Sequence, residues 1–190
     1  MGRWEPNARG RLAEAALELY SERGFEQTTV AEIARRAGLT ERTYFRHYAD
    51  KREVLFGGSE LRDLLVGAVA GVPETTAPID ALAAGLDAVS EMFDDRREYA
   101  RKRQAVIVAN AELQERELIK LASLSAALAA TLRGRGVPEP AASLSAETGI
   151  AVFKVGFERW ITEAEERAMS LVMRDVLDEL KALTAGGRTS

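Results

Sequence analysis

Six basic residues lie close together near the N-terminus of a chain that is acidic as a whole. The formal charge of the 190 residues is −4, whereas the segment 33–52 holds six basic and two acidic residues, a balance of +4. Guanidinium and ammonium groups bind phosphates, and a guanidinium also pairs with the O6 and N7 atoms of guanine. The patch therefore indicates a polyanionic partner, in particular double-stranded DNA. Its basic residues are Arg35, Arg36, Arg42, Arg46, Lys51 and Arg52.

The same segment has the local signals of two short helices joined by a tight turn. Thr29 and Glu32 have the spacing of a capping box at the start of the first helix. Gly38 stands where the chain must turn, and Thr40 is placed to cap the second helix. This pattern is typical of a helix-turn-helix, whose second helix enters the major groove of DNA. The alternative is an ordinary surface pair of helices in an α-helical protein.

The second helix of this pair divides into an inward and an outward side. Tyr44 and Tyr48 are four residues apart, so they lie on one side of the helix, and we expect that side to face inward. Arg42, Thr43 and Arg46 are then free to face a partner. Arg42 is the best candidate for reading a base, because its fork of donors matches guanine.

Beyond this pair, helical spacing of apolar residues predicts an all-α fold with about nine helices. We expect a helix-turn-helix domain over residues 1–56 and a second helical domain over residues 57–190. The first has 10 basic and 9 acidic residues, a balance of +1, and the second has 16 and 21, a balance of −5. Asp50 is expected to cap the fourth helix, which Gly57-Gly58 interrupts as a local kink or as a hinge between domains.

Composition excludes several kinds of chemistry. The chain has no cysteine and one histidine, so disulfides, thiol catalysis and multi-histidine metal sites are ruled out. No metal site and no cofactor are expected. The chain also lacks an apolar run long enough to cross a membrane, and its N-terminus has no apolar core of a secretory signal. We therefore expect a cytoplasmic protein without a membrane partner.

A second basic run follows residue 95. Two interpretations are open for it: another contact with nucleic acid, or a solvated face of a helix, which the acidic residues beside it favour. The run consists of Arg96, Arg97, Arg101, Lys102 and Arg103.

The segment from Gly24 to Leu55, GFEQTTVAEIARRAGLTERTYFRHYADKREVL, resembles the N-terminal domain of the TetR (tetracycline-repressor) family of bacterial transcription regulators. The resemblance covers about the first third of the chain. It rests on Gly24-Phe25, Thr28-Thr29-Val30, Ile33-Ala34, Ala37-Gly38, Thr43-x-Phe45, His47-Tyr48 and Lys51. It implies a DNA-binding transcriptional regulator: a repressor that binds a pseudo-palindromic operator as a homodimer and is released by a small molecule.

The resemblance also assigns roles to single residues. The positions that match base-facing positions of the family are Glu41, Arg42, Thr43 and Phe45. Those that match phosphate-contacting positions are Thr28, Thr29, Arg46, His47 and Lys51. Phe45 departs from the tyrosine that is usual in the family, so a phosphate hydrogen bond is lost there and an apolar contact with a thymine methyl group can replace it.

For the second domain the resemblance implies a dimer surface on the last two helices and a ligand pocket among the middle ones. We expect the last two helices over residues 141–162 and about 163–183. The dimer candidates are Val152, Trp160, Leu171, Val176 and Leu180. The pocket candidates are Phe93, Ile107, Phe153 and Phe157. Plain core packing is the alternative for both sets.

The sequence therefore leaves three functions open. The first is the ligand-responsive regulator, whose effector is expected to be hydrophobic or acyl-type because the segment 110–132 is faintly similar to regulators of acyl chains. The second is a helical dimeric scaffold or sensor with a non-functional DNA-binding helix. The third is an all-α enzyme, for which the sequence contains no catalytic constellation.

Overall fold

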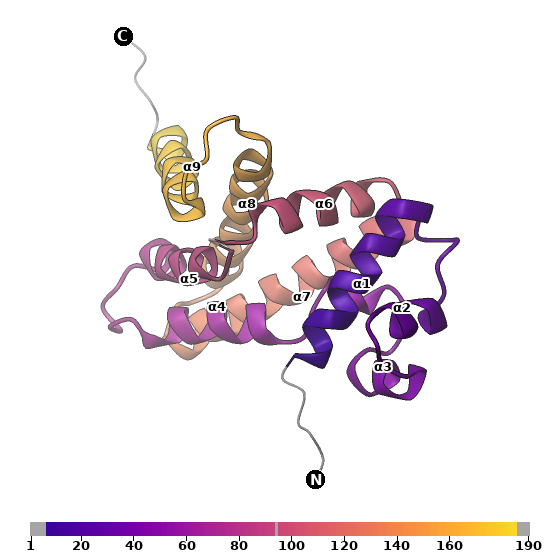
Figure 1. Ribbon diagram of the computed structural model, residues 1–190. Coiled ribbons are helices and arrows are strands. Elements are labelled where there is room, and N and C mark those ends of the chain that lie inside the picture. Colours follow the sequence, from indigo (N-terminus) through magenta and orange to yellow (C-terminus); the bar gives the residue numbers. More distant parts are fainter. Residues whose placement is uncertain (1–6, 94, 186–190) are drawn as a thin grey trace. The chain divides into compact units, whose positions relative to one another are not determined.

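The computed structural model describes residues 7–93 and 95–185. This part of the chain folds into nine α-helices and one short 3-10 helix, without any strand. The expected all-α fold is thereby confirmed (Figure 1). The elements are α1 (Ala8–Arg23), α2 (Val30–Arg36), α3 (Glu41–His47), η1 (Glu53–Leu55), α4 (Glu60–Gly71), α5 (Pro78–Phe93), α6 (Arg97–Val108), α7 (Ala111–Gly134), α8 (Ala141–Thr162) and α9 (Met169–Thr184).

The chain divides into two compact units. The first unit comprises the chain up to Gly58 together with Lys102–Ile119, and the second comprises Ser59–Arg101 together with Lys120–Ser190. Helices α6 and α7 therefore contribute residues to both units. The sequence places a boundary near residue 56, but nothing in it indicates that the segment 102–119 joins the first unit.

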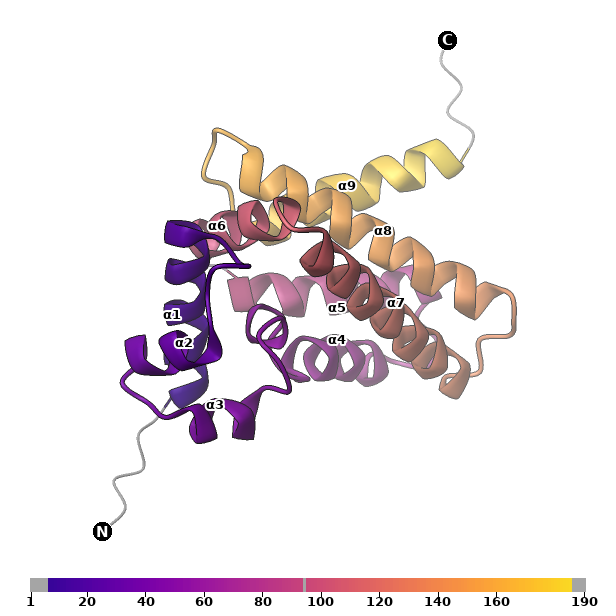
Figure 2. The same cartoon turned by 90° about the vertical axis from the view of Figure 1, so that its right-hand side faces the viewer.

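Three N-terminal helices and the 3-10 helix form the body of the first unit. Helix α1 packs against α2 and η1, and α2 packs against α3. Figures 1 and 2 show α3 at the outer edge of this group. The core contains Leu12, Tyr20, Phe25, Ile33 and Tyr44, each at most 3% exposed. This core fixes the position of α3 in its unit.

The segment 102–119 joins the first unit through arginine side chains. The Arg103 Nε atom donates to the carbonyl oxygen of Leu55 at 2.7 Å, and its guanidinium lies 5.0 Å from the ring centre of Phe56. Arg116 pairs with Glu53 of η1. Ile107 of α6 is fully buried. The end of α6 and the start of α7 thus hold the turn that follows α3.

The second unit is a bundle in which α5 packs against α4, α8 and α9. Its main core cluster joins α4, α5, α7 and α8 and includes Val69, Leu82, Leu128 and Leu132. A second cluster surrounds Trp160 at the end of α8. No helix of the described residues is both long and apolar enough to cross a membrane.

Two helices begin later than the sequence predicts. Asp50 accepts the backbone N–H groups of Arg52 at 2.8 Å and Glu53 at 3.3 Å beside the 3-10 helix, so it does not cap α4. The chain then breaks at Gly57, which has a φ of 65°, and α4 begins at Glu60. Helix α8 spans the predicted residues 141–162, whereas α9 begins at Met169 instead of about residue 163.

The close approach of α4 and α5 depends on Gly85. A Cβ atom at this position would lie 2.7 Å from Leu65 Cδ1, 2.9 Å from Val69 Cγ2 and 3.3 Å from the Leu65 carbonyl oxygen. Gly85→Ala is therefore expected to lower the free energy of unfolding by about 1–3 kcal/mol, because α4 must move. Urea denaturation followed by circular dichroism measures this change.

The control for this substitution is Gly67→Ala in α4. Gly67 is exposed, and nothing lies within 4 Å of a Cβ atom added there. Alanine should raise the free energy of unfolding by about 0.5–1 kcal/mol at such a helical position. Changes of the same sign at both positions would contradict the close approach as the cause.

Candidate nucleic-acid interface

The start of α2 has the capping box predicted from the sequence. The Thr29 hydroxyl accepts the N–H of Glu32 at 3.3 Å, and the Glu32 carboxylate accepts the N–H of Thr29 at 3.0 Å. Arg23 of α1 pairs with the same carboxylate at 2.8 Å. Thr29 is exposed, whereas Thr28 is 1% exposed and donates its hydroxyl to the Gly24 carbonyl at 2.9 Å. The Thr28 hydroxyl therefore faces the interior and is left out of the proposed phosphate contacts.

The turn between α2 and α3 is held by a residue of α1. Gly38 has a φ of 67°, which suits a residue without a Cβ atom. Arg11 donates through Nε to the Ala37 carbonyl at 3.0 Å and contacts the turn through Nη2 as well. Thr40 accepts the N–H of Thr43 at 3.2 Å and so begins α3. The angle between the two helices is thus set by side-chain contacts from outside the motif.

Two tyrosines anchor the inner side of α3, as the sequence predicts. Tyr44 is fully buried and donates its hydroxyl to the Asp50 carbonyl at 3.0 Å. Tyr48 donates its hydroxyl to the Arg9 carbonyl of α1 at 3.2 Å. Burial raises the pKa of Tyr44, so its hydroxyl stays protonated as a donor. These bonds fix the rotation of α3 about its axis.

The opposite side of α3 is open to solvent. Glu41, Arg42, Phe45 and Arg46 are exposed, and the Phe45 side chain is 54% exposed. Thr43 is half-buried, with its hydroxyl 3.1 Å from that of Thr40. Three of the four residues expected to read bases therefore lie on one exposed surface together with Arg46.

Ion pairs divide the basic patch into two classes. Arg36 pairs with Glu18 at 2.9 Å and with Glu22 at 3.1 Å, and Arg52 pairs with Asp50 at 2.7 Å. Arg35, Arg42 and Arg46 have no ion-pair partner among the residues that the structure describes. The charge available to a polyanion is therefore concentrated on α3 and the end of α2. The sequence did not indicate this division, because the partners of Arg36 lie on α1.

The last two expected phosphate contacts have partners or neighbours within the unit. Lys51 donates to the Phe25 carbonyl at 3.1 Å, and its ammonium lies 4.1 Å from the Phe25 ring centre. His47 is half-buried; desolvation, Arg46 and Arg9 lower its pKa, so it is neutral at pH 7. Arg9, the second residue of α1, is thus near His47.

The capping box makes the stability of the first unit sensitive to acid. Hydrogen bonds from the Thr29 N–H and hydroxyl, and then from Arg23, lower the pKa of Glu32 from its ordinary 4.5 to about 2. A carboxyl with a lowered pKa stabilises the fold above its unfolded pKa and loses this contribution as the pH falls through its folded pKa. The melting temperature should therefore fall less steeply from about pH 4.5 to about pH 2 in Glu32→Gln than in the natural chain.

Calorimetry of both proteins over this pH range tests the expectation. Glutamine is a suitable control, because its amide also fits the third position of a capping box. Parallel curves for the two proteins would contradict a titrating role for Glu32.

The residues expected at a dimer surface divide between core and surface. Val152 and Trp160 are each 2% exposed and pack inside the second unit, so they are left out of a proposed dimer surface. Val176 and Leu180 are half-buried beside Leu86 and Val152. Leu171 is exposed. The structure instead exposes an apolar row on α8, formed by Leu144, Ala151 and Val155.

The four residues expected to line a ligand pocket are divided between the two units. Phe93, Phe153 and Phe157 form an aromatic cluster in the second unit, with ring centres 5.8 Å apart for Phe93 and Phe157 and 5.9 Å apart for Phe153 and Phe157. The ring centre of Trp160 lies 6.2 Å from that of Phe93 in the same cluster. Ile107 belongs to the first unit, where it is fully buried. Three of the four candidates therefore lie together.

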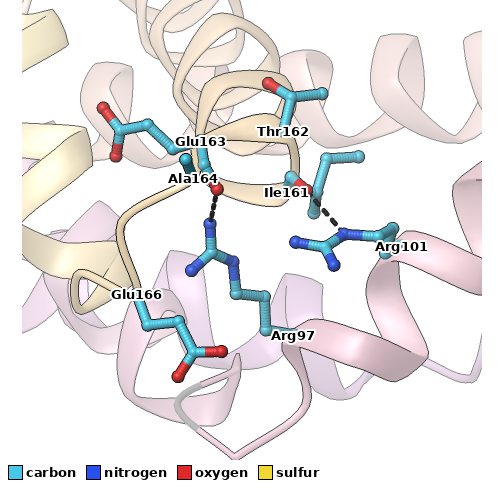
Figure 3. Close-up of a pocket in the computed structure, with 7 residues that line it drawn as sticks. All are labelled: Arg97, Arg101, Ile161, Thr162, Glu163, Ala164 and Glu166. Atoms are coloured by element: carbon cyan, nitrogen blue, oxygen red, sulfur yellow. Dashed lines mark hydrogen bonds between the residues drawn. The ribbon is translucent and has the colours of Figure 1, made fainter.

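Arginines of the second basic run bind backbone carbonyls, which neither of the two interpretations anticipated. Arg97 and Arg101 donate to carbonyls at the end of α8 and in the turn after it (Figure 3). Arg103 donates to the Leu55 carbonyl in the first unit. The sequence carries no signal for these bonds, because the acceptors lie about 50 to 70 residues away along the chain.

The chain is similar in sequence to known bacterial regulators. Residues 12–56 match the family model described as bacterial regulatory proteins, tetR family. The chain is 33% identical over 115 residues to MftR of Mycobacterium tuberculosis, which is named as a transcriptional regulator of mycofactocin biosynthesis. This match covers 60% of the chain and only 58% of that relative.

Solved structures share the fold over nearly the whole chain. The fatty acid degradation regulator FadR from Bacillus halodurans has a TM-score of 0.61 and 18% identity, with 98% of this chain and 99% of that chain covered. FadR of Thermus thermophilus, solved in complex with lauroyl-CoA, has a TM-score of 0.56 and 21% identity, with 96% of each chain covered. At these identities the likeness concerns the fold alone.

Proposed function

We propose that this chain, whose residues 12–56 match the model of the tetR family of bacterial regulatory proteins, is a member of that family and a DNA-binding transcriptional regulator that acts in the cytoplasm as a dimeric, ligand-released repressor. Its relatives are named as regulators and not as enzymes, so the all-α enzyme is set aside. The observation that carries the proposal is the exposed side of α3.

That exposed side has the chemistry of a major-groove surface. Arg42 and Arg46 are exposed and have no ion-pair partner in the described part of the chain, while Tyr44 and Tyr48 hold the helix from behind. Arg42 is assigned to guanine and Phe45 to a thymine methyl group. Glu41 can accept from cytosine N4, and Thr43 lies at the edge of the same surface.

Phosphate contacts position this helix on the duplex. We assign them to Thr29, Arg46, His47 and Lys51. The Lys51 ammonium is held beside Phe25, so its position is set before DNA arrives. The lowered pKa of His47 favours the neutral ring, so we assign it a contact through a ring N–H. Each phosphate that a cation neutralises releases counterions, so the affinity should fall steeply with salt.

A dimer supplies the second recognition helix. We propose that the apolar row of Leu144, Ala151 and Val155 on α8, with Leu171 on α9, forms the contact between two copies. Leu144 and Val155 are 64% and 55% exposed, although large apolar side chains are more stable when covered. A twofold contact would present two α3 helices to half-sites roughly 34–36 Å apart.

The effector is proposed to be hydrophobic and acyl-type. The aromatic cluster of Phe93, Phe153 and Phe157 supplies an apolar surface in the second unit. The T. thermophilus structure with lauroyl-CoA is a protein of the same fold that holds such a molecule. A ligand that binds better to the DNA-free state shifts the population toward that state and so releases the operator.

Fluorescence anisotropy with fragments of the gene's own upstream region tests the proposed function. The protein is titrated at low and physiological salt, with and without competitor DNA. Binding that survives competitor, weakens with salt and reverses on addition of a fatty acyl-CoA supports the proposal. If competitor DNA abolishes all binding to the labelled fragments while the protein is a stable dimer, the helical scaffold with a non-functional DNA-binding helix is favoured.

A further inference from the structure

An open cavity of about 530 Å³ lies where the start of α6 meets the end of α8. None of its lining residues belongs to α3 or is one of the aromatic residues Phe93, Phe153 and Phe157. Figure 3 shows the side chains that line it. The lining residues are Arg97, Arg101, Ile161, Thr162, Glu163, Ala164 and Glu166.

Arg97 is fixed in place but has a donor left over. Its Nη1 atom donates to the Glu165 carbonyl at 3.0 Å, and its Nη2 atom donates to the Glu163 carbonyl at 2.5 Å. Its guanidinium also lies 5.9 Å from the Trp160 ring centre. The Nε atom is buried and has no hydrogen-bond partner among the described residues. A buried donor without a partner costs free energy, so this atom calls for an acceptor.

Arg101 brings further donors to the same cavity. Its Nε atom donates to the Ile161 carbonyl at 2.8 Å, which leaves both Nη atoms without a partner in the described part of the chain. In Figure 3 the guanidinium groups of Arg97 and Arg101 face each other across the cavity. Two like charges held this way repel each other unless an anion lies between them.

Neither carboxylate that lines the cavity forms an ion pair with Arg97 or Arg101 among the described residues. Glu163 pairs with Arg159 at 2.9 Å and with Arg167 at 3.7 Å. Glu166 has no ion pair among the described residues, although it lines the same cavity. The backbone carbonyls hold the guanidinium groups in position without cancelling their charge.

We propose that this cavity binds the phosphate or carboxylate group of a small organic anion between Arg97 and Arg101. The planar donors of a guanidinium match such oxyanions in geometry as well as in charge. Ile161 and Ala164 provide an apolar wall for the rest of the molecule. The volume is in the range of metabolite sites. This site goes beyond the proposed function, and its occupancy is measured without DNA.

The test is isothermal titration of the full chain with inorganic phosphate and with acetate, each against chloride at matched ionic strength. Saturable binding is expected for at least one oxyanion, and the preferred one distinguishes a phosphate ligand from a carboxylate ligand. Arg97→Met and Arg101→Met should each weaken binding by about tenfold or more, since each removes a charge-assisted contact.

Two further variants control this experiment. Glu166→Gln should strengthen binding several-fold, because it removes a negative charge from the cavity. Arg96→Met should leave binding unchanged, because Arg96 is exposed on the same segment but does not line the cavity. Circular dichroism verifies that each variant is folded, and Arg101→Lys replaces Arg101→Met if the latter does not fold.

Two outcomes would overturn the site. One is the absence of saturable binding for both oxyanions in the natural chain. The other is that Arg96→Met weakens oxyanion binding as much as Arg101→Met does, while Glu166→Gln does not strengthen it. Such a result would show that binding depends on general surface charge. DNA binding by α3 is unaffected by either outcome.

Discussion

Arg42→Ala is expected to weaken binding to the operator by about 1–3 kcal/mol and to relax its sequence specificity. Arg42 is exposed on the outer side of α3 and makes no ion pair in the described part of the chain. Its removal should therefore take away the proposed contact with a base and leave the fold intact. Anisotropy titrations with the operator and with single-base variants measure both effects, and the melting temperature should stay unchanged.

Matched substitutions separate base reading from charge and from stability. Lys51→Met keeps the apolar stem near Phe25 but removes a proposed phosphate contact. It should therefore weaken binding to all DNA sequences alike and lower the salt dependence of the affinity, on logarithmic axes, by about 1. Arg36→Ala should instead lower the melting temperature, because Arg36 joins α2 to Glu18 and Glu22 of α1. An equal loss on every sequence for Arg42→Ala would exclude a base-reading role.

Val155→Glu is expected to convert the proposed dimer to a monomer and to reduce operator binding by at least tenfold. Val155 is 55% exposed at the C-terminal end of the apolar row on α8. In a twofold contact the substitution occurs once in each copy, so two carboxylates enter one apolar interface. An unpaired charge without water costs several kcal/mol, which exceeds what a single valine contact contributes. Analytical ultracentrifugation measures the dissociation constant.

The control for this prediction is Val108→Glu at the end of α6. Val108 is 62% exposed and belongs to the first unit, whereas the proposed dimer surface lies on α8 and α9 of the second unit. This variant should remain dimeric. A Val155→Glu protein that is still dimeric at low micromolar concentration would show that the contact lies on another surface, and its operator binding would then be expected to persist.

The local signals of the sequence proved reliable where neighbours in the chain determine the structure. The capping box of Thr29 and Glu32, the turn at Gly38 and the inward side of Tyr44 and Tyr48 all depend on residues within a few positions of one another. Helical spacing and caps of this kind can be predicted from the sequence without tertiary information. The family resemblance and the all-α fold followed from the same short segment and from the apolar periodicity.

Tertiary contacts decided the points at which the expectations and the structure differ. Residues 163–168 are mostly helix formers, but Arg97 donates to the Glu163 and Glu165 carbonyls, and α9 begins only at Met169. The hydroxyl of Thr28 is likewise turned inward by the carbonyl of Gly24. Helix propensity is a weak preference that such contacts override.

The sequence by itself therefore determined the class of fold, the family resemblance and the segment that carries the basic patch, because each of these depends on residue type and short spacing. Only the tertiary structure decided which charges are available. Arg36 is neutralised by α1, Arg42 and Arg46 are left exposed, and Arg97 and Arg101 face each other across a cavity. The physical reason is that the partners of a charged side chain are its neighbours in space, and in a folded chain these come from distant positions.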